Sequence, residues 1–158
     1  LKHIKLKAEI IFLGDGKNKN KLIDFSKNFV DCTKIIFKGR VSRNIAIEHM
    51  LEADVSISLS KGEGLPIAVL ESMYAGCFQI LSKIPPHKEI SPPSNRCIFV
   101  DQSNKLQIRN SLNFMINNIS LIRAEKSVSQ EYSINNFGID NMLKRYKKVY
   151  DSFSNINS

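Results

Sequence analysis

The sequence predicts an α/β domain built on an open parallel sheet with helices on both faces. Two observations predict it: short apolar runs alternate with helical patterns as far as Asp101, and the first two runs end at glycine. A chain of 158 residues suits one well-packed domain and is too short for two of ordinary size. We therefore expect a single domain over 1–158, with a core at about 8–101, helices at about 102–153 and a frayed tail at 154–158.

The expected strands are apolar runs bounded by turn residues. Glu9–Leu13 stops at Gly14-Asp15-Gly16, and Lys34–Lys38 stops at Gly39. The run at 55–59 alternates apolar and small side chains, as a half-buried strand does. Further strands are expected at 78–81 and 97–100. Because helical segments separate these strands, we expect the strands to be parallel.

Apolar residues at helical spacing predict the helices between the strands, at 19–29, 45–51 and 66–75, the last of them closed by Gly76 as a C-cap. After the sheet we expect helices at 105–117 and at about 135–153. The final helix is amphipathic and basic. Packing against the sheet is the commoner fate of such a helix, and a place on a membrane surface is the alternative.

The most informative motif is Glu63–Glu71, in which two carboxylates lie eight positions apart across Gly64-Leu65-Pro66. Pro66 suits the first position of a helix, and Gly64 lets the backbone come close to a ligand. The N–H groups around Gly64 and Leu65 would lie at the positive end of a helix dipole, where an anion is stabilised. The pattern predicts a site for a polyol and a phosphate, with the carboxylates accepting hydrogen bonds from hydroxyls.

Other polar segments also follow predicted strands. Ligands of open parallel sheets bind beyond the carboxyl ends of the strands, so these segments should meet at one cleft. Asp15 is expected to shape its turn rather than to touch ligand, whereas Lys61 is a candidate partner for phosphate. A lone loop histidine such as His87 is expected to be exposed. The segments are Gly14–Gly16, Gly39–Val41, Lys61–Pro66 and the loop Lys83–Glu89.

The net charge of +8 and the pI of about 9.5 suit nucleic acid, an anionic membrane surface or a phosphorylated substrate. The lysines lack the interleaved aromatic residues of a single-strand binder, so we expect no nucleic acid. For any single lysine, a solvated basic face remains the simpler interpretation. With no membrane-span pattern and no evident signal peptide, a cytoplasmic location is expected, with the inner face of the membrane as the alternative.

Several chemistries are disfavoured by spacing. Gly14-Asp15-Gly16 lacks the third glycine of a dinucleotide fingerprint, and no P-loop or serine-hydrolase elbow is present. No cluster of His, Cys and carboxylates suggests a metal site, and no cofactor is expected. The cysteines have no metal-ligand spacing and lie in or beside apolar runs, which indicates reduced, mostly buried thiols. They are Cys32, Cys77 and Cys97.

Five segments, in order, resemble the retaining family 4 glycosyltransferases over roughly residues 8 to 150. The run from Ser60 through Phe78 is similar to the E-x(7)-E region of that family. The other four segments are Leu13–Gly16, Phe37–Val41, Ala53–Val55 and Ser82–Glu89. The resemblance implies the Rossmann-like C-terminal half of a GT-B fold, which binds a nucleoside-diphosphate sugar.

The resemblance also implies roles for particular residues. Glu71 would accept hydrogen bonds from the ribose hydroxyls of the nucleotide. Glu63, the catalytic candidate, would contact the hydroxyls of the donor sugar and balance positive charge at the anomeric carbon. Arg40 and Val41 would frame the base. The remaining donor-binding candidates are Gly64, Leu65 and Pro66 near the sugar or diphosphate, together with Lys61, Gly14 and Gly16.

The chain also departs from this family. Against the family pattern we expect the first strand of the usual domain to be missing, together with the following loop whose arginine and lysine clamp the diphosphate. The N-terminal domain, which supplies the acceptor pocket, is absent from this sequence as well. Because group transfer needs stabilised leaving-group charge in a water-excluded site, we expect the fragment alone to bind weakly and catalyse little.

The implied function is metal-free transfer of a hexosyl group, with retention, to a glycan or lipid-linked acceptor in cell-surface polysaccharide or lipopolysaccharide biosynthesis. A non-catalytic binding or assembly module with the same fold is the alternative. Another GT-B enzyme such as an epimerase would lack this glutamate pair around Gly-Leu-Pro. The base, the sugar, the acceptor and the oligomeric state stay open at this stage.

Overall fold

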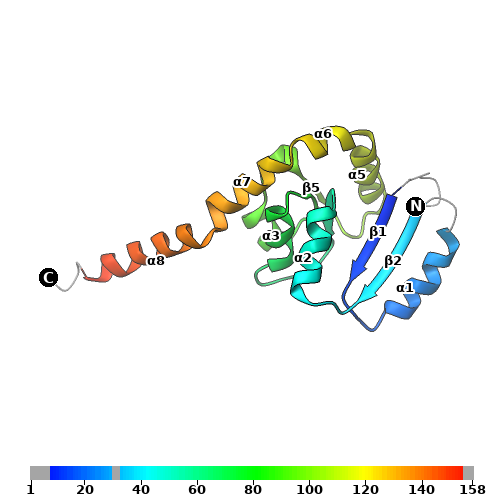
Figure 1. Cartoon of the computed structure of the whole chain (residues 1–158), viewed down its shortest axis with the longest axis horizontal. Helices are drawn as coiled ribbons and strands as arrows, with labels where there is room; N and C mark the ends of the chain where they lie inside the picture. Colours follow the sequence, from blue (N-terminus) through cyan, green and yellow to red (C-terminus); the bar gives the residue numbers. More distant parts are fainter. Residues whose placement is uncertain (1–7, 30–32, 155–158) are drawn as a thin grey trace.

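The computed structural model describes residues 8–29 and 33–154 (Figure 1). Within them β1 pairs with β2, and β3, β4 and β5 form a second sheet in that order, with every pairing parallel. The predicted strands are confirmed, each to within one residue at either end. Their bounds are β1 Ala8–Leu13, β2 Thr33–Gly39, β3 Val55–Ser58, β4 Phe78–Ser82 and β5 Cys97–Val100.

The helices follow the predicted order with three differences. The segment expected as a loop after β4 contains a short helix, α4, which Pro85 begins. The helices over most of 119–134 were not predicted. The expected final helix is divided at Gly138, whose extended backbone separates two helices. The helices are α1 Lys19–Ser26, α2 Arg43–Glu52, α3 Ile67–Tyr74, α4 Pro85–Ile90, α5 Lys105–Asn117, α6 Ile119–Ala124, α7 Lys126–Phe137 and α8 Ile139–Ser154, with 3₁₀ turns η1 Lys27–Phe29 and η2 Ser94–Arg96.

Each of the two sheets leaves two strand edges without a partner among the described residues, and the free edges of β1 and β3 bear on the order of the strands. β1 lies between β2 and the rest of the molecule (Figure 1), and neither its second edge nor that of β3 belongs to a ladder. The side chains of Phe12 and Ile57 on these strands are 43% and 47% exposed, although parallel sheets are normally covered on both faces. A parallel strand between β1 and β3 would complete the doubly wound order.

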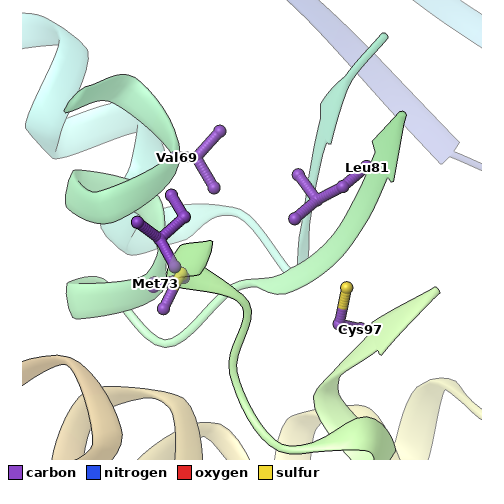
Figure 2. Close-up of a cluster of buried hydrophobic side chains, with 5 residues drawn as sticks. Val69, Met73, Leu81 and Cys97 are labelled. Carbon is purple, nitrogen blue, oxygen red and sulfur yellow. The ribbon is translucent and has the colours of Figure 1, made fainter. Parts of the chain in front are cut away.

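The core lies on both faces of the three-stranded sheet. All five residues of β4 are buried. One cluster, which includes Val69 and Met73 of α3 and Leu81 of β4, fills the first face (Figure 2). The second cluster joins Phe78 and Ile80 to Ile122 of α6. Helices therefore cover both faces of the sheet, as predicted.

The prediction that the last helix packs against the sheet is wrong. α7 packs on α3, and the chain then leaves the body so that α8 projects from it (Figure 1). Because α7 already covers the outer side of α3, the apolar side of α8 faces solvent, with exposures from 46% to 69%. None of the helices that the structure describes is both long and apolar enough to cross a membrane. The exposed apolar residues of α8 are Ile139, Met142, Leu143, Tyr146, Val149, Tyr150 and Phe153.

Arg96 ties the helical layer to the sheet from a fully buried position. Its guanidinium donates to the carbonyl oxygens of Ile122 and Gly76, each at 2.9 Å, and to Ser129 Oγ at 3.0 Å. It also lies 5.6 Å from the ring centroid of Phe78. Burial of the guanidinium lowers the pKa of Arg96. Its three hydrogen bonds link the residue after α3 with α6 and α7.

We expect Arg96→Met to lower the free energy of unfolding by about 3 kcal/mol, because it leaves two buried carbonyl groups without a donor. Urea unfolding followed by circular dichroism measures the change. Arg109→Met on the exposed side of α5 is the matched control and should leave the midpoint nearly unchanged. Equal loss in the two variants would show that Arg96 is not an anchor.

Cys77 and Cys97 are buried thiols, as predicted, whereas Cys32 lies outside the described residues. Burial raises the pKa of Cys77 to about 11 and that of Cys97 to about 12. A raised pKa keeps each thiol protonated at pH 8, so alkylation by iodoacetamide should be on the order of 100-fold slower in the folded than in the urea-unfolded chain. Peptide mapping by mass spectrometry reports each site separately, and rapid labelling of either native thiol would contradict its burial.

Candidate functional site

The carboxyl ends of β1 and β2 are fastened to each other by the turn residues. Gly14 N–H donates to the carbonyl oxygen of Gly39 at 2.7 Å, and Arg40 N–H donates to Asp15 Oδ2 at 2.8 Å. Lys19 binds the other oxygen of Asp15. The hydrogen bonds from Lys19 and from Arg40 N–H lower the pKa of Asp15. Asp15 thus shapes this turn, as predicted.

The loop after β2 leads to a bond that sequence reasoning missed. Ser42 caps α2 by accepting from Ile45 N–H at 3.4 Å. Arg43, the first residue of α2, donates from Nε to Glu71 Oε1 at 2.7 Å. This bond fixes the loop of Arg40 and Val41 to α3. Its only sequence signal is a cation a few residues after a strand end, which is too common a pattern to identify a partner 28 positions away.

The start of α3 presents backbone donors. Gly64 and Leu65 are exposed, and the N-cap residue Pro66 makes no side-chain cap. Among the described residues, the N–H groups of Gly64, Leu65 and Ala68 have no acceptor. An unsatisfied helix N-terminus is a place where an anion is stabilised.

Helix α3 begins one residue later than predicted. The helix begins at Ile67, and Pro66 is the residue before it, with φ −78° and ψ 73°. Its ψ is not helical, so the turn continues through Pro66, and its side chain is buried.

At the other end of α3 the prediction of Gly76 as a C-cap is confirmed. Gly76 has φ +87° and its N–H donates to the carbonyl oxygen of Met73, while Cys77 N–H donates to that of Ser72.

Glu63 contacts a buried histidine. Its Oε1 lies 3.4 Å from Ser58 Oγ and 3.5 Å from His87 Nε2. The expectation that His87 is exposed is wrong, because α4 turns the ring inward to complete burial. Nδ1 of that ring lies 3.1 Å from both Oγ and the carbonyl oxygen of Ser82 at the end of β4.

The predicted site residues therefore form two groups on one edge of the fold. Gly14, Gly16, Arg40 and Val41 gather where β1 and β2 end, and the segment from Lys61 to Glu71 follows β3. The bond between Arg43 and Glu71 joins the two groups. Glu63 and Glu71 do not bind each other; each has its own nitrogen partner. Within the described ranges, no three His, Cys, Asp or Glu side chains gather as a metal site would require.

The model of the family of group 1 glycosyl transferases matches residues 1–130. The chain belongs to this family. No curated protein matches the sequence significantly.

Solved structures show the same fold at low sequence identity. Sucrose-phosphate synthase from Thermosynechococcus elongatus superimposes with a TM-score of 0.75 at 14% identity, over 94% of this chain and 38% of that one. HepE from Anabaena, solved in complex with UDP-glucose, gives 0.74 at 16% identity, over 90% of this chain and 40% of that one. The C-terminal domain of the group 1 protein LpcC from Francisella tularensis gives 0.67 at 20% identity, over 87% and 90%.

These matches establish the fold as that of the C-terminal domain of a GT-B glycosyltransferase, as the sequence predicted. The chain spans about two fifths of the length of sucrose-phosphate synthase and of HepE.

The turn at Gly39 offers a test of how the first group is held. Gly39 has φ +69°, and an added Cβ would lie 2.9 Å from Lys19 Nζ and 3.2 Å from Asp15 Oδ2. We expect Gly39→Ala to lower the free energy of unfolding by about 1–2 kcal/mol, because side chains disfavour this backbone region. Gly62→Ala, where the Cβ meets open space, is the control in urea unfolding. A Gly39 variant as stable as the control would show that the turn tolerates a side chain.

Proposed function

We propose that this chain is the donor-binding half of a retaining glycosyltransferase, which transfers a hexosyl group from a nucleoside-diphosphate sugar to a glycan or lipid-linked acceptor. The observation that carries the proposal is the open N-terminus of α3, flanked by Glu63 and Glu71 within the span that the family model matches. Unpaired N–H groups suit a diphosphate, and carboxylates suit sugar hydroxyls.

Glu71 is arranged to bind ribose. Arg43 occupies Oε1 of its carboxylate, which leaves Oε2 as an acceptor for a hydroxyl group. The guanidinium carries a permanent positive charge, so this hydrogen bond is charge-assisted. The backbone of Arg40 and Val41 lies in the loop that this bond fastens to α3, so we propose that it frames the base.

The diphosphate would lie against Gly64, Leu65 and Ala68, with Lys61 beside it as an exposed cation. The excess of basic residues favours a donor with negative charge. Backbone amides and cations can neutralise the diphosphate, so the proposed reaction needs no metal. Glu63, on the sugar side of the turn, would stabilise positive charge at the anomeric carbon during transfer.

The acceptor site belongs, in this proposal, to the part of the complete protein that the chain does not cover. Two of the similar structures are more than twice as long as this chain, and HepE was solved with UDP-glucose. Closure of a second domain over the carboxyl edge would exclude water and complete the site. The proposed pathway is cell-surface polysaccharide or lipopolysaccharide synthesis.

A second candidate function is a non-catalytic assembly module. One observation favours it: the exposed apolar side of α8 offers a surface to a partner. Nucleotide binding separates the two candidates, because the module has no need of a donor.

Calorimetric titration of the complete protein with UDP, GDP, ADP and their glucose or mannose derivatives tests the proposal. We expect one nucleotide sugar to bind, and Glu71→Gln to weaken its binding about 10-fold or more through loss of a charge-assisted hydrogen bond. Glu131→Gln, on the exposed side of α7, is the control. No binding by the wild-type protein would overturn the function, and unchanged binding by Glu71→Gln would overturn only the role of Glu71.

Glu63→Gln is expected to act differently. It should lower kcat by more than it raises KM, because the positive charge at the anomeric carbon develops only in the transition state. Steady-state kinetics of the complete enzyme measure both. A change confined to KM would assign Glu63 to binding alone.

A further inference from the structure

The hydrogen bonds around His87 fix the position of one ring proton. Ser82 Oγ lies 2.6 Å from the carbonyl oxygen of Ser60 and donates its single proton there. Toward His87 Nδ1 this hydroxyl can therefore only accept, and so can the carbonyl oxygen of Ser82. Two acceptors at 3.1 Å require that Nδ1 carries a hydrogen.

The other ring nitrogen, Nε2, faces Glu63, and the contacts of Nδ1 do not decide whether Nε2 carries a proton. Nε2 lies 3.4 Å from Ser58 Oγ and 3.5 Å from Glu63 Oε1. If Nε2 is unprotonated, its lone pair faces a carboxylate oxygen, which is repulsive, and only the Ser58 hydroxyl can donate to it. A proton on Nε2 turns this contact into a charge-assisted hydrogen bond.

The surroundings offer one anionic partner to a proton on Nε2. The ring of His87 is fully buried, and a buried cation needs a paired anion. Among the described residues, Glu63 is the one charged group recorded in contact with the ring, because the other neighbours are the serines of β3 and β4. Glu63 in turn is only 26% exposed.

We infer that His87 is a positioning residue for Glu63. In its doubly protonated form it binds one carboxylate oxygen of Glu63 from inside the fold and leaves the other for a hydroxyl of the donor sugar. This inference rests on the proposed function for the role of Glu63, but the position of the ring protons does not depend on it. Ser82 sets the orientation of the ring, and the ring sets the orientation of Glu63.

The ring protons can be observed without any donor. Two-bond ¹H–¹⁵N spectra of the complete protein should show His87 Nδ1 in the protonated form whether or not Nε2 titrates, whereas a free neutral imidazole in water carries its proton mainly on Nε2. The Ser82→Ala variant, which removes one of the two acceptors, should reduce that preference. A neutral His87 with its proton on Nε2 in the wild-type protein would overturn the inference.

Two isosteric variants separate positioning from packing. Glutamine at 87 places an N–H donor near the position of Nε2, whereas asparagine places one near that of Nδ1. We expect His87→Gln to bind a nucleotide sugar within about threefold of wild type and His87→Asn to bind it about 10-fold more weakly, because a charge-assisted hydrogen bond is lost. Both should bind the parent nucleotide alike, since it lacks the sugar that Glu63 contacts.

The probes are UDP-glucose, GDP-mannose and ADP-glucose with their parent diphosphates, and the pair that binds the wild-type protein is used. A purely structural role would weaken sugar and parent nucleotide equally in both variants, and that result would overturn the inference. If the wild-type protein binds none of the probes, the proposed function fails, and the ¹⁵N spectrum still decides the position of the ring protons.

Discussion

The site depends on the burial of β4 from both sides. All five of its residues are buried between α3 on one face and the helices after the sheet on the other, so its position cannot adjust independently. Ser82 is the last residue of this strand, and it binds both Ser60 and His87. The burial of an apolar strand thereby sets the location of polar groups at the carboxyl edge. Glu63 contacts His87, so we infer that the buried core also sets the position of Glu63.

The two parts of the site belong to two sheets that are not joined by a ladder. β1 and β2 carry the turns at Gly14 and Gly39, whereas β3 and β4 carry the segment after Ser58. In a doubly wound sheet, ligands bind where the strand order reverses, which here is the interval between β1 and β3. The bond between Arg43 and Glu71 joins α2 to α3. A strand placed in that interval would complete the same edge that presents the proposed donor-binding groups.

Local patterns predicted the strands well because each is a short apolar run stopped by a glycine or a polar residue. Local patterns did not predict the structure where the buried side chains are polar. α7 buries Ser129 and Ser133, so its apolar spacing is too weak to predict a helix. His87 was expected to be exposed because its burial depends on Ser58 and Ser82, which lie on other elements. The family motif identified the correct stretch, but only the folded chain shows which nitrogen each glutamate faces.

The two glutamates of the motif differ in the partners that the fold gives them. Glu71 faces a guanidinium, whose charge is permanent. Glu63 faces an imidazole, whose charge depends on one proton at Nε2. In the proposed function Glu71 contacts the ribose, whereas Glu63 lies near the anomeric carbon, where positive charge develops in the transition state. The fold therefore gives the two glutamates different partners, although the sequence shows the same residue at both positions.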